Sequence, residues 1–152
     1  MAVPVLIPVP SESMGRSDTG GCPAATRAMI AEKGPFYLRL SRGPFPVITT
    51  EETPFVVGKA NVVREGKDVT VVACVVMVGE SLNAAKELEK EGLSVRVVNM
   101  HTIKPIDVDI LVRCAKETGA IVTAEEHQVN GGLGSAVAEA LVKTCPVPVE
   151  MV

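Results

Sequence analysis

The sequence predicts an α/β domain built on a mostly parallel sheet, with helices on both of its faces. Three short apolar runs rich in β-branched residues are typical of strands buried on both sides, and they span residues 69–78, 94–100 and 120–124. Apolar residues at helical spacing follow each run, over residues 82–91, 108–118 and 135–141. Because this alternation requires right-handed crossovers, residues 50–152 are predicted to form a three-layer βαβαβαβ unit.

The composition fits one domain, or one domain and a piece of another. Of the 152 residues 47% are hydrophobic but only 3% are aromatic, so the core must consist of Val, Ile, Leu, Ala and Met. The net charge of −3 argues against nucleic acid as the main partner. No run of 18 apolar residues occurs, so no membrane span is expected. The four cysteines lack CxxC spacing, which favours reduced thiols in a cytoplasmic protein.

The first part of the chain is predicted to form a strand, a helix and a second strand. Prolines interrupt the β-like run at residues 3–10, which indicates an edge strand or an extended lead-in. A polar, glycine-rich loop is expected at 11–21, a helix at 23–33 and a strand at 36–40. Proline and threonine then punctuate residues 45–53, which places a domain boundary near residue 50.

Several turn and cap residues are predicted in the second part. Residues 55–63 are expected to form a strand that makes a hairpin with the strand at 69–78. Ser81, in a turn after that strand, could cap the next helix, and Gly92 is expected to end it. Asp107 suits the start of the helix at 108–118. A last strand is expected at 149–152.

The polar stretch at residues 125–134 is the first place to look for function, because ligands and partners gather at the carboxyl ends of parallel strands. Glu125, Glu126 and His127 could support acid–base catalysis, but adjacent turn residues point in different directions. A polar contact at a subunit or domain interface is therefore the favoured interpretation. The glycine-rich bend that follows could offer backbone N–H groups to an anion, or it could be a tight turn. It does not match the GxGxxG dinucleotide fingerprint.

Other candidate chemistry in the sequence is weak. His101 and His127 follow what are predicted to be neighbouring strands, but no HxH or HxxxH spacing supports a zinc site. Nucleophile motifs and phosphate loops are also absent, so no metal site and no catalytic set is expected. Arg42 follows a predicted strand, where its guanidinium could bind a carboxylate or a phosphate. A solvated surface arginine is the alternative.

Four segments, in this order, resemble transketolases. They are GPFYLRLSRG at 34–43, VTVVACVVMVGESLNAAKEL at 69–88, HTIKPID at 101–107 and EEHQVNGGLGSAVAEAL at 125–141. The chain is most similar to the carboxyl-terminal subunit of split, two-chain transketolases, and the likeness covers nearly all of it except residues 12–21. The set TIKPID plus EEH…GGLG also resembles deoxyxylulose-phosphate synthase and the β subunit of 2-oxo-acid dehydrogenases, whereas LSRG favours transketolase.

The resemblance implies a division of the chain and an activity. Residues 1–48 would be the last strand–helix–strand of a pyrimidine-binding domain, and residues 49–152 a transketolase C-terminal domain lacking its final helix. The complete enzyme would be a cytoplasmic, dimeric transferase of the pentose phosphate pathway. It would move a two-carbon ketol unit between sugar phosphates, using thiamine diphosphate and Mg²⁺. Neither cofactor is expected to bind this chain alone, because the family's catalytic glutamate and GDG…N metal-binding segment are missing from this sequence.

The resemblance also implies roles for individual residues. Arg42 matches the family arginine that contacts the substrate phosphate. The family's C-terminal domain supplies no catalytic group and packs in the dimer, so an interface role is expected for a set of residues at the strand-end edge: Lys104, Glu126, His127, Gly131, Gly132 and Gly134.

The chain is therefore expected to be inactive alone. Its expected partners are an N-terminal transketolase chain or segment, a further copy of itself, and sugar phosphates. One alternative is a non-catalytic assembly or regulatory domain. Another is the equivalent part of deoxyxylulose-phosphate synthase or of a 2-oxo-acid dehydrogenase β subunit.

Overall fold

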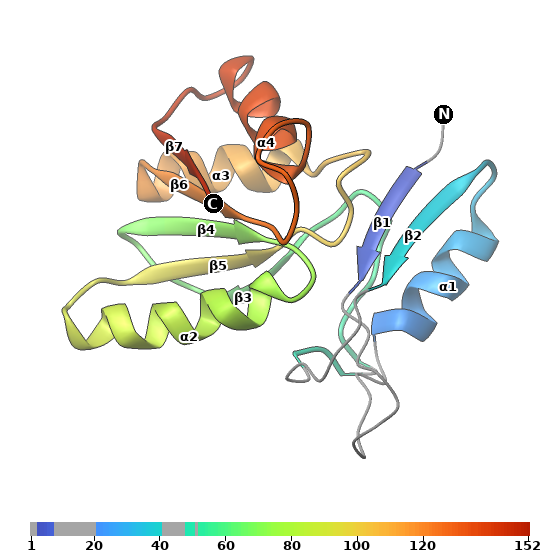
Figure 1. The fold of residues 1–152 in the computed structure, drawn as a ribbon, viewed down its shortest axis with the longest axis horizontal. Coiled ribbons are helices and arrows are strands. Elements are labelled where there is room, and N and C mark those ends of the chain that lie inside the picture. The colour runs from blue at the N-terminus through green and yellow to red at the C-terminus, as the bar shows by residue number, and fades with distance from the viewer. Residues whose placement is uncertain (1–2, 8–20, 41–47, 51) are drawn as a thin grey trace.

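A computed structural model describes residues 3–7, 21–40, 48–50 and 52–152, which form two separate sheets (Figure 1). The smaller sheet has two strands in the order β1-β2, and the larger has five strands in the order β3-β5-β4-β6-β7. None of the helices in these described ranges is long and apolar enough to cross a bilayer.

The smaller sheet is the predicted strand–helix–strand unit. Strands β1 (Val3–Ile7) and β2 (Phe36–Leu40) pair in parallel, and helix α1 (Gly21–Ala31) lies between them in the chain. The helix begins two positions before the predicted start and ends at Ala31. Ala25 is its buried contact residue, whereas Ile30 is 80% exposed. Most of the predicted loop before α1 falls outside the described residues.

The larger sheet is mostly parallel, as predicted. Strand β4 (Val69–Ala73) lies at its centre and pairs in parallel with β5 (Val95–Asn99) and β6 (Ile121–Ala124). Strand β7 (Val149–Met151) extends the sheet in parallel beyond β6 and confirms the last predicted strand. The exception is β3 (Asn61–Arg64), which pairs with β5 in antiparallel fashion.

The predicted hairpin between the first two strands of this sheet is wrong. The chain leaves β3, passes over the start of β5 and enters β4 on its far side. Two backbone N–H groups, of Lys67 and Asp68, donate to the Ser94 carbonyl oxygen, at 3.1 and 2.9 Å. A Cβ atom at Gly66 would overlap the backbone of β5, so a glycine is needed where the crossing chain approaches. The turn-like sequence at 65–68 therefore forms a connection that crosses the end of β5, and not the turn of a hairpin.

Helices cover both faces of the larger sheet, which confirms the three layers (Figure 1). Helix α2 (Met77–Lys90) lies on one face, and α3 (Val108–Thr118) and α4 (Leu133–Val142) lie on the other. Successive strand residues point alternately to the two sides. Thus Val72 and Val98 pack in the core under α3 and α4, whereas Ala73 and Val97 pack under α2. Burial on both faces explains why the strands are almost continuously apolar.

The predicted boundary between the central strand and α2 is wrong. The strand ends at Ala73 and the helix begins at Met77, so the apolar run 69–78 contains a strand, a turn and a helix start. Ser81 lies inside α2 and does not cap it, because its hydroxyl donates to the Met77 carbonyl oxygen at 2.6 Å. All parts of this run contact the core, so hydrophobicity alone does not mark where the strand stops.

The helix ends predicted at Gly92 and Asp107 are confirmed. Gly92 has φ +88°, and its N–H donates to the Glu89 carbonyl oxygen while the Leu93 N–H donates to that of Leu88, which is a Schellman motif. Asp107 caps α3 by accepting a hydrogen bond from the Ile110 N–H at 3.3 Å. Gly119 ends α3 in the left-handed conformation, with φ +72°.

Candidate functional site

The polar turn after β6 is organised by the carboxylate of Glu125. This side chain follows the last residue of the strand and reaches the first turn of α4. Its Oε2 accepts a hydrogen bond from the Leu133 N–H at 2.8 Å, and its Oε1 accepts one from the Gly134 N–H at 2.9 Å. Both donors belong to the group that a helix leaves without an internal partner. The helix start therefore already holds an anionic group from its own chain, which favours the tight-turn interpretation over an external anion site.

The glycines of this turn each have a local structural reason. A Cβ atom at Gly132 would overlap the Glu125 carboxylate. At Gly134 it would lie 2.8 Å from the Met151 sulfur and 2.9 Å from the Thr123 hydroxyl oxygen. Gly131 has φ +81°, and its N–H donates to the Ser135 hydroxyl at 2.8 Å. The GGLG sequence is thus required for the close approach of α4 to the ends of β6 and β7.

The two sheets meet at a cleft beside this turn. The cleft has a volume of about 320 Å³ and lies between β2 and the carboxyl edge of the larger sheet. Tyr37 and Arg39 line it from β2, and Glu125 and His127 line it from the turn. The Arg39 Nη2 donates a hydrogen bond to the Glu126 carbonyl oxygen at 3.1 Å. The chain itself therefore already makes a polar contact at the predicted interface.

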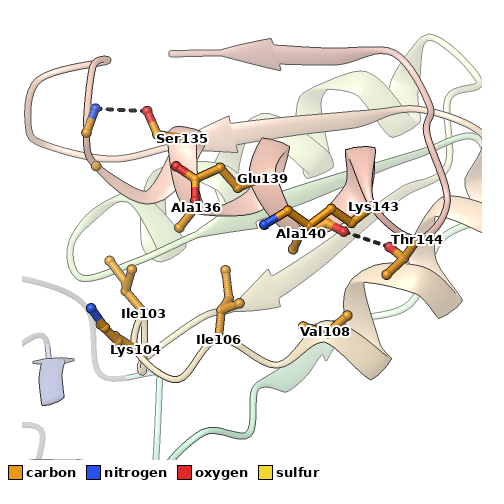
Figure 2. A pocket seen from close by; sticks show the side chains of 12 residues that line it. Ile103, Lys104, Ile106, Val108, Ser135, Ala136, Glu139, Ala140, Lys143 and Thr144 are labelled. Atoms are coloured by element: carbon orange, nitrogen blue, oxygen red, sulfur yellow. Dashed lines mark hydrogen bonds between the residues drawn. The ribbon is translucent and has the colours of Figure 1, made fainter.

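A larger groove of about 580 Å³ adjoins the cleft, and the two share Ile103, Gly131 and Gly132 (Figure 2). It runs between α4 and the segment that leads from β5 into α3. Apolar side chains from both sides line it: Ile103, Ile106, Val108, Ala136 and Ala140. Three exposed charged residues also line it, namely Lys104, Glu139 and Lys143. A mostly apolar groove that also carries charges of both signs has the character of a surface for another polypeptide.

The structure brings most of the predicted interface residues to this one edge. Lys104 lines the groove, His127 lines the cleft, and Gly131 and Gly132 line both. The side chain of Glu126 is exposed, and its carbonyl oxygen contacts Arg39. Gly134 is buried in the first turn of α4, against Thr123 and Met151. Arg42, the predicted phosphate-binding residue, lies outside the described residues.

The two histidines do not follow neighbouring strands, so that prediction is wrong. Strand β4 lies between β5 and β6. His101 is only 3% exposed, and its ring stacks on Phe55 with a centroid distance of 4.2 Å. Its Nδ1 lies 3.0 Å from the Thr102 hydroxyl oxygen, and burial lowers the pKa of His101 to about 4. Within the described ranges, no three His, Cys, Asp or Glu side chains are grouped to hold a metal ion.

Cys74 is the thiol at the same end of the sheet, directly after β4. It is 3% exposed, and burial raises its pKa to about 12, with the negative charge of Glu125 acting in the same direction. A thiol of this kind stays protonated at neutral pH and is a poor nucleophile.

Tyr37, Arg39 and the capping role of Glu125 were missed by the sequence analysis. Alternation along residues 36–40 does place Arg39 on one face of a strand. No local signal, however, connects it with Glu126, which is 87 positions away in the chain. Likewise, the spacing between Glu125 and α4 resembles no standard capping motif, because the acceptor comes from the preceding strand.

Comparisons with known proteins agree with this architecture. The family model described as transketolase, C-terminal domain, matches residues 58–152. A 6-deoxy-6-sulfo-D-fructose transketolase subunit from Clostridium sp. (strain MSTE9) is 47% identical over 135 residues, which cover 89% of this chain and 42% of that protein. The 1-deoxy-D-xylulose-5-phosphate synthase of Heliobacterium modesticaldum is 42% identical over 117 residues, which cover 76% of this chain and 18% of that enzyme.

A solved structure extends the likeness over almost the whole chain. It is described as a split gene transketolase, in the form of an inactive β4 tetramer. The TM-score is 0.86 at 42% sequence identity, and the match covers 99% of this chain and 47% of that one. The chain therefore spans less than half the length of the relatives compared with it.

Proposed function

Because the chain belongs to the family of transketolase C-terminal domains, we propose that it is the carboxyl-terminal part of a transketolase that is completed by an N-terminal chain or segment. The complete enzyme transfers a two-carbon ketol unit between sugar phosphates. The observation that carries this proposal is the likeness to the split gene transketolase, which extends over 99% of the chain. That likeness includes the β1–α1–β2 unit, which we assign to the end of a pyrimidine-binding domain.

The proposal places the thiamine diphosphate and Mg²⁺ sites outside this chain, and two features of the described residues support it. These residues contain no group of three metal-ligating side chains, and the Leu133 and Gly134 N–H groups at the start of α4 are already bonded to Glu125. We therefore assign cofactor binding to other parts of the complete enzyme.

Arg42 is the residue that we assign to substrate binding. The basis is the LSRG sequence at residues 40–43, together with the ability of a guanidinium to form paired hydrogen bonds with a phosphate. Replacing Arg42 by Ala in the complete enzyme should raise KM for phosphorylated sugars and change little for unphosphorylated donors. Equal kinetic effects on both kinds of substrate would contradict the assignment. Arg27→Ala, an exposed arginine on α1, is the matched control.

The cleft and groove are the surface that we assign to partner contact. Their lining includes Lys104, His127, Gly131 and Gly132, and Glu126 lies beside them. The partner is the remainder of the transketolase, a second copy of this chain, or both. Self-association is supported by the description of the 42% identical relative as a β4 tetramer.

A ketol-transfer assay tests the proposal. The purified chain is assayed alone, and then mixed with candidate N-terminal transketolase chains, with thiamine diphosphate and Mg²⁺ present in both cases. We expect activity only in a mixture. Activity from the chain alone would contradict the assignment of the cofactor site to another chain. A stable complex without activity would instead support the alternative of a non-catalytic assembly domain.

A further inference from the structure

Two neighbouring strands of the larger sheet, β4 and β6, send the chain in opposite directions (Figure 1). From β4 the chain continues through α2 on one face to β5, whereas from β6 it continues through α4 on the other face to β7. In open α/β sheets, the carboxyl ends of two such strands leave a crevice in which ligands bind. The turn after β4, which starts at Cys74, and the turn after β6, which starts at Glu125, meet at this switch point. The topology of the sheet therefore indicates a ligand site there.

The cleft between the two sheets lies at this switch point. Glu125 and Arg39 both line it, and their charges also act on the thiol of Cys74. Burial raises the pKa of Cys74 most, Glu125 raises it further, and Arg39 lowers it, so both turns of the switch point are close to the cleft. Ligand pockets typically have volumes of about 300–1,000 Å³. The cleft, with about 320 Å³, therefore has room for a small molecule.

The cleft presents a cation whose donors are only partly used. Arg39 is half-buried and donates one Nη2 hydrogen bond to the Glu126 carbonyl oxygen, whereas a guanidinium has five N–H donors. Among the ion pairs between described residues, none involves Arg39. The Glu125 carboxylate also lines the cleft, but both of its oxygens accept N–H groups of α4, which offset part of its charge. The further donors of Arg39 can therefore pair with an external oxyanion.

The other lining side chains suit a short organic molecule. Tyr37, two positions before Arg39 on the same face of β2, is 58% exposed, and its hydroxyl can donate a hydrogen bond. His127, from the turn after β6, is also exposed and offers an imidazole N–H. Ile103 supplies an apolar wall. A few polar groups that converge beside an apolar side chain are typical of small-molecule sites.

We propose that this cleft binds a small organic anion, with its carboxylate or phosphate group on Arg39 and its short body against Tyr37 and Ile103. The charge of Arg39 sets the class of ligand, and the volume of the cleft limits its size. The site goes beyond the proposed function, because neither the assigned substrate residue Arg42 nor the contact with a partner requires it. In this arrangement the contact with a polypeptide falls to the adjoining groove.

Anion binding is measured by two-dimensional NMR on the isotope-labelled chain alone, so the result does not depend on the proposed function. Inorganic phosphate and succinate are titrated at constant ionic strength, with chloride as the reference anion. We expect saturable shifts of the amide signals of Tyr37, Ile103 and Gly131 with at least one of the two probes. The dissociation constant should be in the millimolar range, because such small probes make few contacts. If neither probe shifts these signals saturably, the proposal is overturned.

Variants identify the charge that holds the anion. Arg39→Ala should weaken binding of the probe by at least about tenfold, and Arg39→Lys should recover part of the loss. Arg27→Ala, which removes an exposed arginine of α1, is the matched control and should leave the affinity unchanged. Equal losses in Arg39→Ala and Arg27→Ala would mean general charge attraction and would overturn the site.

A second pair of variants keeps the test decisive if Arg39→Ala does not fold. Tyr37→Phe removes only a hydroxyl and should weaken binding by about threefold, because one hydrogen bond to the anion is lost. Arg39→Lys keeps the charge and loses the fork. Unchanged affinity in both of these variants would contradict the placement of the anion between Arg39 and Tyr37.

Arg42→Ala separates this site from the proposed substrate site, and it should leave anion binding at the cleft unchanged. If Arg42→Ala abolishes the shifts and Arg39→Ala does not, the probes bind at the assigned substrate residue and the cleft proposal is overturned. If Arg39→Ala abolishes them and Arg42→Ala does not, the cleft site stands whatever the ketol-transfer assay shows.

An acidic side chain of the partner is another source of the same chemistry. The phosphate and succinate titrations are therefore repeated on the complex with an N-terminal chain. We expect the affinity of the cleft to be retained. Loss of anion binding on assembly would show that the partner fills the cleft and would overturn the small-molecule site.

Discussion

At the carboxyl end of β6, Glu125 accepts two N–H groups of α4, and its neighbour Glu126 leaves its own carboxylate in solvent. Replacing Glu125 by Ala should lower the free energy of unfolding by about 1–3 kcal/mol, because two helix N–H groups lose a charged acceptor. Glu126→Ala, one position away, should change it by less than about 0.5 kcal/mol. Urea denaturation of the two variants measures the contrast, and equal losses would contradict the capping role.

The glycines of the same turn should differ in their tolerance to a side chain. Gly132→Ala places a Cβ atom on the Glu125 carboxylate and should destabilise the chain more than Gly131→Ala, which meets no atom within 4 Å. The loss of stability in Gly131→Ala comes from the positive φ alone and should be about 1–2 kcal/mol. Gly131→Asn should lose less, because asparagine adopts a positive φ more readily than alanine. Denaturation midpoints rank the stabilities of Gly132→Ala, Gly131→Ala and Gly131→Asn. If Gly131→Ala is the least stable, backbone conformation at Gly131 matters more for this turn than the contact between Gly132 and Glu125.

His101 should make stability depend on pH in the acidic range. Its pKa is about 4 in the folded chain, lowered by burial from the usual 6.5, and the nearby Asp107 charge opposes this only in part. The unfolded chain therefore binds more protons between these values, so stability is full above pH 6.5 and is lost as pH falls toward 4. The loss due to His101 should be about 3 kcal/mol.

A His101→Gln variant isolates this contribution. It keeps a polar side chain beside Thr102 but does not titrate in this range. The free energies of unfolding of the two proteins are compared from pH 7 to pH 4, and the contributions of carboxylates that titrate in both proteins cancel in the difference. The excess free energy of unfolding of the unaltered chain over His101→Gln should decrease steadily as pH falls. If the free energies of unfolding of the two proteins change in parallel with pH, the pKa of His101 is not lowered in the folded chain.

At the scale of elements, Asp107 joins the start of α3 to the approach to β3. Its Oδ1 caps the helix, its Oδ2 accepts the Ala60 N–H at 3.0 Å, and Lys59 lies 3.5 Å away. Replacing this buried side chain by Ala should cost about 2–3 kcal/mol, because two N–H groups lose their acceptor. Asp109→Ala is the control, since that side chain is 91% exposed and its ion pair with Lys59 lies at the surface.

Thermal denaturation compares the two aspartate variants. A larger loss for Asp109→Ala would show that the surface ion pair, and not the cap, connects these elements. Asp107→Asn should fall between the two. The amide keeps one acceptor oxygen for the helix but gives up the charge that favours a helix start.

At the scale of the whole molecule, the groove between α4 and the segment before α3 should control assembly. Ala140→Glu places a charge against Ile106 and Val108 and should weaken association with a partner or a second copy by at least about tenfold. Ala84→Glu, on the exposed side of α2 across the sheet, should leave association unchanged. Light scattering after size exclusion measures both, and similar masses for the two variants would contradict the role of the groove.

The order of elements and the nature of their ends could be predicted from the sequence. Apolar runs, helical spacing, the Asp107 cap and the glycines Gly92 and Gly119 act over a few residues, so each carries its own local signal. The resemblance to transketolases rests on segments of the same kind. The boundary before α2 was missed because strand, turn and helix are all apolar there, and a buried residue looks alike in each.

Sequence by itself thus determined the class of fold, most elements and the family. Only the tertiary structure decided that β3 pairs with β5, that β4 separates the two histidines, and that Arg39 reaches Glu126. It also showed that Glu125 is bound to α4 and is not free for chemistry. The physical reason is separation along the chain. Residues that meet only through packing, such as Arg39 and Glu126 at 87 positions apart, produce no periodic pattern in the sequence. A backbone carbonyl acceptor also occurs in every residue, so the sequence does not indicate which carbonyl is used.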